Sequence, residues 1–507
     1  MPLANGFCSR GLPRRHEPRP EVASSGAPAK SPVMRAPLPP FLRTSMPAAA
    51  LGLAAVAVGI WWWGCLCLFS TGGWNAVRLA PSFMWRAGVN PYPGPLAGPV
   101  TTWIYGPLPI LLEWPATLTH DAASALLAGG VISLALLAAP MVLAVLAQAG
   151  PTASFTTRGW ACLLALAGLP AVNLVYCQAD NAAVACGLLA GVLLTGPAPP
   201  TQTRLWLAAA AATLALWAKQ TELGPVLGQI IYLGLRYGRR AAAAQALRAA
   251  ATGGLAGLVF CRVFGAEGLV YNMFILPAGF PLLEPAAKTV HPLYLGFVLT
   301  YVVAPALLVA LLAPRLFRRD HPALAPVLVF ACSLPFNFAG FLPIGGNLNS
   351  LHGAVYLLPA AALWLAARRL RPSPWPWPAP AALAAVLAVQ IASQWPLPLH
   401  LQQTGLREGA SLARQLPGEI YFPWNPLLTF FSEGRFSHVE DGLITRSLAG
   451  RPVPPSVVKA YLPPRMCVVA YHRYAIDGYV RGLIPIDAKR TAYGEWILFS
   501  WPPPAVP

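Results

Sequence analysis

Long apolar runs that are almost free of charge constrain this chain more than any other feature. About eleven such runs lie between residues 47 and 396, and most approach or exceed the roughly 17 residues that a spanning helix needs. Only 10% of all residues are charged, against about 25% in a typical soluble protein. The pattern predicts an all-α polytopic membrane protein whose transmembrane part covers residues 47–396. The predicted spans are 47–69, 122–148, 159–177, 181–197, 204–218, 222–237, 248–264, 291–313, 323–343, 352–367 and 378–396.

The distribution of basic residues predicts an orientation in the membrane. Residues 1–46 are rich in Pro, Arg, Ala and Ser and predict a disordered, basic, cytoplasmic tail. The run 47–69 is too long for the apolar part of a signal peptide, so we expect it to remain as the first span. Counting spans from this tail places the arginine clusters on the cytoplasmic side, as the positive-inside rule requires. The clusters contain Arg204, Arg236, Arg239, Arg240, Arg315, Arg318, Arg319, Arg368, Arg369 and Arg371.

The net charge of +18 does not indicate a nucleic-acid partner. The basic residues are divided among short connections between apolar runs, whereas a nucleic-acid-binding surface gathers them into one patch or stripe. The expected partner is membrane lipid. Because the Ala, Pro and Arg bias is typical of a GC-rich bacterial genome, we expect the bacterial inner membrane as the location.

The composition changes after residue 396. Residues 397–507 carry mixed charge and turn residues, which predict a small α/β or α+β domain on the extracytoplasmic side. Within it we expect a helix over 403–415 and strands over 468–470 and 496–499. The polar stretch that holds Glu433, His438, Glu440 and Asp441 is interpreted as a loop. No Cys/His spacing typical of a metal site occurs, so no metal is expected.

Polar residues that could carry chemistry gather at the predicted outer ends of the spans. None of the acidic residues falls at the centre of a confident span, which argues against an ion-coupled transporter. The short, Pro-rich segment 106–118 is expected to lie in the outer interface or to enter the membrane and return. Arg78 and Arg86 are either ligands of an anion or the charged side of an interfacial helix over 74–86.

Four outer segments carry recurring motifs. The first outer loop, residues 70–121, contains Gly88-Val89-Asn90-Pro91-Tyr92, followed by Tyr105-Gly106-Pro107-Leu108. The other motifs are Gln178-Ala179-Asp180, Lys219-Gln220-Thr221 and the stretch from Gly345 to His352, which includes Asn347 and Asn349.

In these motifs the chain resembles the C superfamily of membrane glycosyltransferases (GT-C), in particular its bacterial mannosyltransferase-like branch. The resemblance covers the membrane part and implies a GT-C-like fold. It also implies that a sugar is transferred from a polyprenyl-phosphate donor to a saccharide, lipid or protein acceptor at the extracytoplasmic membrane face. Such a reaction uses the lipid-linked sugar phosphate as donor substrate and needs no cofactor.

The resemblance assigns roles by chemistry. Cations hold the donor phosphate through charge-assisted hydrogen bonds, and the candidates are Arg78, Arg86, Lys219, Lys288 and His352. Polar and aromatic side chains of the motifs would line the substrate pocket. These are Asn90, Tyr92, Tyr105, Gln178, Gln220, Asn347 and Asn349.

A carboxylate must deprotonate the acceptor hydroxyl, and here the chain departs from the family. The usual acid early in the first outer loop is absent, because Asn75 stands near its place and no acidic residue occurs between Ser70 and Leu112. Asp180 is the first substitute, followed by Glu113 and Asp121. Asp180 beside Lys219 could equally be a buried structural ion pair.

Two other functions therefore remain open. The protein could bind or flip a lipid-linked saccharide without catalysis, which the missing acid favours. A transporter is the weaker alternative, because no acid lies at mid-membrane.

Overall fold

The apolar runs fold into helices. The computed structural model describes residues 40–69, 73–149, 154–169, 175–196, 198–282, 295–296, 298–312, 324–346, 348–358, 378–394, 403–472 and 479–503. Each predicted span overlaps a helix in its described residues, although the helix in the span 159–177 ends at Ala167 and residues 175–177 are not helical. The helical part comprises α1 (Pro40–Phe69), α2 (Gly73–Arg86), α3 (Leu108–Leu112), η1 (Trp114–Leu118), α4 (Ala122–Ala149), α5 (Phe155–Ala167), α7 (Ala179–Leu194), α8 (Gln202–Ala218), α9 (Gly224–Tyr237), α10 (Arg239–Phe264), α11 (Ala266–Val270), η2 (Tyr271–Ile275), α12 (Leu276–Ala278), η3 (Leu299–Val303), α15 (Ala304–Leu312), α16 (Leu324–Phe341), η5 (Leu348–Leu351) and α18 (Pro378–Gln394).

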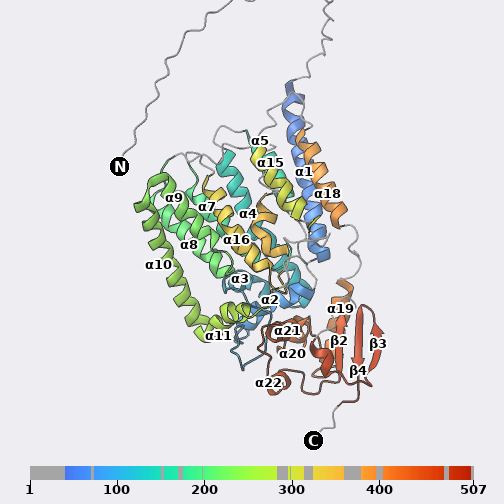
Figure 1. Cartoon of the computed structure of the whole chain (residues 1–507). Coiled ribbons are helices and arrows are strands. Elements are labelled where there is room, and N and C mark those ends of the chain that lie inside the picture. Colours follow the sequence, from blue (N-terminus) through green and yellow to red (C-terminus); the bar gives the residue numbers. More distant parts are fainter. Residues whose placement is uncertain are drawn as a thin grey trace, which may run out of the picture. The chain divides into compact units, whose positions relative to one another are not determined.

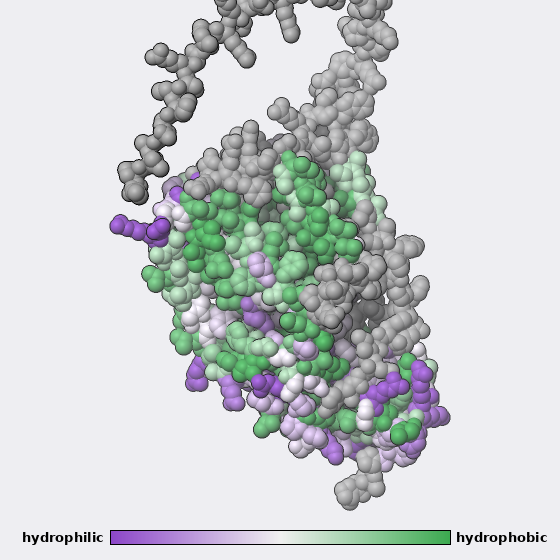
Figure 2. Space-filling view, viewed as in Figure 1, coloured by the Kyte–Doolittle hydropathy of each residue, from purple (hydrophilic) through white to green (hydrophobic). Residues whose placement is uncertain are grey.

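Four helices of the described part are long and apolar enough to cross a membrane. They are α1 over Ala48–Cys67, α4 over Ala122–Ala147, α10 and α16, while α7 and residues 301–311 form shorter apolar helices. Large apolar side chains on α1 and α10 are exposed, for example Leu53 and Leu258 at 73% each. Figure 2 shows this apolar surface over the helical part. Because such a surface is stable only in lipid, the chain is an integral membrane protein, while the number of helices that cross stays a prediction.

The segments between α1 and α4 are not spanning helices. Residues 106–118 form only α3 and η1, which lie with α2 at one end of the bundle in Figure 1. Most of α2 is buried, including Leu79, Phe83 and Met84. The helix α2 therefore does not form an interfacial helix with one face in lipid. The interpretation of Arg78 as a side chain that snorkels to the lipid headgroups loses support.

The C-terminal region, residues 403–503, contains a four-stranded sheet in the order β1-β2-β4-β3. Strands β1 (Ile420–Tyr421) and β2 (Val468–His472) are parallel, and β4 (Trp496–Ser500) pairs antiparallel with β2 and with β3 (Lys489–Tyr493). The surrounding helices are α19 (Gln403–Gln415), α20 (Pro426–Glu433), α21 (Glu440–Leu448), α22 (Pro455–Ala460) and η6 (Tyr479–Leu483). The expected helix over 403–415 and the strands at 468–470 and 496–499 all lie where the sequence predicted them.

The C-terminal region packs directly against α2. Phe83 makes edge contacts with Phe430 and Phe431, at 5.5 and 5.4 Å between ring centroids, and Trp74 contacts Trp424 at 5.1 Å. Residues 46–507 accordingly form one compact unit. The predicted boundary at 396/397 remains an expectation, as does the division of the chain between the two sides of the membrane.

Candidate functional site

A buried ionic network joins three of the predicted motifs. Asp180, in the first turn of α7, accepts through Oδ1 from Lys219 Nζ at 2.6 Å, and His352 Nδ1 lies 2.9 Å from the same oxygen. Asn349 Nδ2 donates to the other oxygen at 3.3 Å. The side chains of Asp180 and His352 are fully buried and that of Lys219 is 5% exposed. Buried charges are stable only when paired, so this network fixes the three segments to one another.

Glu222 extends the network on the other side of His352. Its Oε1 contacts His352 Nε2 and accepts from Asn337 Nδ2 at 2.7 Å, and its Oε2 accepts from Ser333 Oγ at 3.1 Å. Gly224 permits this close approach of α9 to α16, because a Cβ there would lie 2.3 Å or less from Ser333 atoms. His352 thus lies between two carboxylates with both ring nitrogens engaged, which favours a positioning role over contact with a phosphate.

The Asn90 and Tyr92 side chains hold the first outer loop in place by hydrogen bonds. Asn90 Nδ2 donates to the Phe264 carbonyl at 3.0 Å, and its Oδ1 accepts from the Tyr92 amide at 2.9 Å. The fully buried Tyr92 hydroxyl donates to the Tyr105 carbonyl at 2.9 Å and accepts from Trp103 Nε1 at 3.0 Å. Both side chains are therefore used in holding the loop to the end of α10.

The loop then meets the Lys219 motif. Gln220 Nε2 donates to the Ile104 carbonyl at 3.1 Å, and the ring centroid of Tyr105 lies 5.7 Å from Lys219 Nζ. Gln178 Oε1 accepts from the Tyr356 hydroxyl at 3.5 Å. The structure therefore brings Tyr105, Gln178, Gln220 and Asn349 around the Asp180–Lys219 pair.

The structure explains why Gly106 stands where the resembled family has the first proline of its Tyr-Pro-Pro-Leu-type element. Its amide donates to the Ala218 carbonyl at 3.1 Å, a hydrogen bond that proline cannot make. A Cβ at this position would lie 1.7 Å from the Trp217 carbonyl oxygen. Only glycine fits where the first loop crosses the end of α8.

Arg78 and Glu113 carry polar atoms that lack partners. Arg78 Nη1 and Glu113 Oε2 are both buried and make no hydrogen bond within the described residues. Burial raises the pKa of the Glu113 carboxyl to about 8, while the positive charge of Arg78 opposes that shift. Buried polar groups of this kind are normally satisfied by protein, water or ligand, so Arg78 and Glu113 mark a candidate ligand position.

The remaining predicted residues have ordinary structural partners or lie outside the described residues. Asp121 caps α4 by accepting from Ser124 N at 2.9 Å, and Arg86 donates to the Thr117 carbonyl. Asn75 accepts from Cys177 N at 2.8 Å and donates to the Val175 carbonyl at 3.1 Å, so it binds α2 to the start of α7. Lys288 and Asn347 lie outside the described residues. Within the described part, no group of three or more His, Cys, Asp or Glu side chains could hold a metal ion.

The interpretation of the stretch from Glu433 to Asp441 as a loop is wrong at both ends, because Glu433 is the last residue of α20. Glu440 and Asp441 form the first turn of α21, beside Arg78 and Thr102 of the first loop. Two acidic residues in succession are typical of a helix N-terminus, and that signal could have revealed the helix. The proximity to the first loop could not have been recognised, because about 340 residues separate the two segments.

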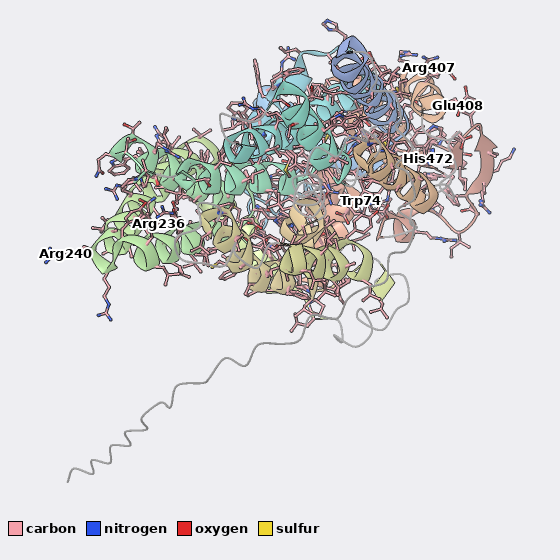
Figure 3. The ribbon with its side chains drawn as sticks, turned by 90° about the horizontal axis from the view of Figure 1, so that it is seen from above. Trp74, Arg236, Arg240, Arg407, Glu408 and His472 are labelled. Atoms are coloured by element: carbon pink, nitrogen blue, oxygen red, sulfur yellow. The ribbon has the colours of Figure 1, made fainter. Side chains whose placement is uncertain are left out.

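Basic residues at the α9–α10 junction lie away from the C-terminal region. Figure 3 shows Arg236 and Arg240 at the edge of the bundle, far from Arg407, Glu408 and His472 of the C-terminal region. Arg240 is exposed. The cytoplasmic position of these arginines stays a prediction.

Comparison with solved structures identifies the fold. The chain is similar to ArnT from Cupriavidus metallidurans in the apo state, with 14% identity, a TM-score of 0.58 and coverage of 90% of this chain and 98% of ArnT. The structure of the same protein bound to undecaprenyl phosphate gives 13% identity, a TM-score of 0.53 and coverage of 88% and 97%. No family model and no curated protein matches the chain. The chain therefore has the fold of ArnT, while the GT-C superfamily and its mannosyltransferase-like branch stay predictions.

Proposed function

We propose that this protein is a membrane glycosyltransferase that moves a sugar from a polyprenyl-phosphate donor to an acceptor. One observation carries the proposal: the fold of ArnT extends over nine tenths of the chain. ArnT has been crystallised with undecaprenyl phosphate, the carrier part of such a donor. The meeting of the Gln178, Lys219 and Asn349 motifs around one buried network adds support.

The proposed reaction is a single displacement. The acceptor oxygen bonds to the anomeric carbon, the bond from that carbon to the phosphate oxygen breaks, and a carboxylate takes the hydroxyl proton. Arg78 is the leading candidate to bind the departing phosphate, because its buried Nη1 has no partner within the described residues. Lys219 is the second candidate, since its ammonium group faces Tyr105 as well as Asp180. No cofactor beyond the lipid-linked donor is invoked.

The finer assignment follows the sequence. We propose a mannosyltransferase-like enzyme of the bacterial inner membrane, with the N-terminus cytoplasmic and the C-terminal region extracytoplasmic. The supporting features are the arginine clusters and the collection of polar motifs at the opposite ends of the spans.

A non-catalytic binder or flippase is the second candidate. It is favoured by Asn75, which stands where the family has its acid and is fully occupied by backbone hydrogen bonds to Val175 and Cys177. A protein of this kind would bind the same donor without breaking its glycosyl–phosphate bond.

The experiment that separates the two uses full-length protein in nanodiscs with radiolabelled undecaprenyl-phosphate hexoses and a membrane extract as the source of acceptor. A transferase consumes at least one donor, whereas a binder retains the label on the lipid carrier. Arg78→Gln is expected to weaken binding of undecaprenyl phosphate. Arg240→Gln serves as the matched control, because Arg240 is an exposed arginine at the start of α10. If the protein binds the undecaprenyl-phosphate hexoses but consumes none of them, the non-catalytic binder is favoured.

A further inference from the structure

The N-terminal end of α21 is fixed on the first outer loop. The Val439 amide donates to the Val100 carbonyl at 2.9 Å, and the Val100 amide donates to His438 Nδ1 at 2.8 Å. A Cβ on Gly442 would lie 2.5 Å from the Thr101 carbonyl oxygen, so helix and loop are in direct backbone contact. The first turn of α21 therefore has a defined position relative to the loop.

Arg446 secures the other end of the same helix. This buried guanidinium donates to the carbonyls of Pro93, Gly94 and Pro95 at 3.0 to 3.2 Å, and it lies 5.2 Å from the ring centroid of Tyr271. Asn272 Nδ2 donates to the same Pro93 carbonyl at 2.9 Å and adds a second contact to this part of the loop. Because α21 is anchored at both ends, a side chain on its first turn is positioned as firmly as one on the loop itself.

Asp441 lies in the first turn of α21, within range of the positive charge of Arg78. The Arg78 charge and the Thr102 hydroxyl both act on its carboxyl, although the Thr102 hydroxyl makes no hydrogen bond of normal geometry. The adjacent Glu440 points elsewhere, accepting from Trp424 Nε1, Tyr471 hydroxyl and the Val480 amide at 2.9 to 3.1 Å. Asp441 is partly exposed, and its interaction with the Thr102 hydroxyl uses only part of its accepting capacity, so its carboxylate can still accept a proton.

The other acids near the site are less suited to that task. Both Asp180 oxygens are occupied by Lys219, His352 and Asn349, and the side chain has no exposed surface. Glu113 is 1% exposed and, with a pKa raised to about 8 by burial, is mainly protonated at neutral pH. Its unpartnered Oε2 and the unpartnered Arg78 Nη1 nevertheless indicate a ligand at this place.

We propose that Asp441 is the catalytic base of the transfer reaction, supplied by the C-terminal region in place of the acid that the first outer loop lacks. The inference rests on the proposed function. In the proposed step, Asp441 accepts the proton of the acceptor hydroxyl as its oxygen bonds to the anomeric carbon, and the carrier phosphate leaves toward Arg78. Glu113, whose pKa burial raises to about 8, stays mainly protonated and leaves the Arg78 charge available to the phosphate.

The pKa of Asp441 agrees with this role. Burial raises it to about 6, and Thr102 and Arg78 oppose the rise. Arg78 from α2 is the charged group that acts on Asp441. Glu440 and Arg446 are the charged neighbours on its own helix, and the titratable His438 just before that helix is neutral. A carboxyl with this pKa is mostly ionised at pH 7 and is a stronger base than an ordinary aspartate.

The test compares Asp441→Asn with the wild type in the nanodisc transfer assay, with Asp487→Asn, an exposed aspartate of the same region, as the matched control. Loss of a general base lowers kcat by about 10²–10⁴-fold. Asp441→Asn is expected to lose activity on that scale while its Kd for undecaprenyl phosphate and its folded yield stay unchanged. Asp487→Asn is expected to match the wild type.

A pH profile provides a readout that a structural role would not move. In the wild type kcat/KM should rise as the pH increases through about 6, because the ionised carboxylate is the active form. Asp441→Glu should recover part of the activity with a displaced profile. Wild-type activity in Asp441→Asn, with the same profile, would overturn the assignment, whereas a wild type that transfers no sugar would overturn the proposed function instead.

Discussion

The Val100 amide donates a hydrogen bond of 2.8 Å to Nδ1 of His438, although 338 residues separate the two. The opposite ring nitrogen, Nε2, donates to the Val457 carbonyl at 3.1 Å. The His438 imidazole is therefore neutral, with its proton on Nε2, and it connects the first outer loop to the C-terminal region. Burial lowers its pKa to about 4.

This contact predicts acid sensitivity. An unfolded histidine, with a pKa of about 6.5, takes up a proton that folded His438 rejects, so stability is complete above pH 6.5 and falls as the pH decreases toward 4. The loss amounts to about 3 kcal/mol across that window. His438→Asn keeps an acceptor for Val100 and cannot titrate, so its apparent Tm should vary less between pH 7 and 4.5. Equal pH dependence of Tm in both proteins would show that His438 is not responsible.

Disruption of the Asp180–Lys219 pair should lower the stability of the fold rather than act directly on the transfer reaction. Replacing Asp180 by Asn leaves Lys219 buried without its carboxylate, and removal of one partner of a buried pair costs about 3–5 kcal/mol. The double variant Asp180→Asn/Lys219→Met should recover part of the lost stability, as measured by thermal unfolding in detergent. If instead Asp180→Asn folds with normal yield and stability but has no transfer activity, Asp180 rather than Asp441 is the base.

Gly106→Ala should prevent correct assembly of the first loop. Its added methyl group would overlap the Trp217 carbonyl, and the hydrogen bond from residue 106 to Ala218 would be lost with it. We expect little monodisperse protein by size-exclusion chromatography. Gly254→Ala is the matched control, because a Cβ there meets nothing within 4 Å inside α10 and should stabilise the helix by up to about 1 kcal/mol. Normal yield of Gly106→Ala would contradict the loop geometry.

Arg446→Met should loosen the first loop without unfolding the bundle. The substitution removes the hydrogen bonds to the Pro93, Gly94 and Pro95 carbonyls but keeps an apolar stem of similar length. Hydrogen exchange of amides in residues 94–101 should accelerate, while exchange in α4 and α10 stays slow. Unchanged exchange in the loop would mean that Asn272 alone holds it in place.

The helical part could be predicted from the sequence because a membrane imposes one requirement on every span. A run such as Ala122–Ala149 has no charged residue, and over that length a helix satisfies every backbone hydrogen bond within the segment in lipid. The short segment 106–118 could also be recognised from its prolines. Strand β3 was not predicted, since Lys489 and Arg490 make it resemble a solvated loop.

The candidate site was predicted only in part, for a physical reason. Asp180, Lys219 and His352 could be placed on one side by counting spans, but their mutual distances depend on how the helices pack. Asp441 could not be associated with Arg78, because the contact is created by the fit of α21 on the first loop through Gly442 and Val439. Sequence motifs indicate which residues carry chemistry, while tertiary packing decides which of them meet.

As the proposed transferase, the protein must break the glycosyl–phosphate bond of a polyprenyl-phosphate sugar. The most direct measurement follows the appearance of free undecaprenyl phosphate from undecaprenyl-phosphate hexoses, using full-length protein in nanodiscs with a membrane extract. We expect release of undecaprenyl phosphate matched by an equal amount of transferred sugar. In Asp441→Asn the rate of this release should fall about 10²-fold or more. Intact donor after prolonged incubation with every hexose, by protein that still binds undecaprenyl phosphate, would contradict the proposed function.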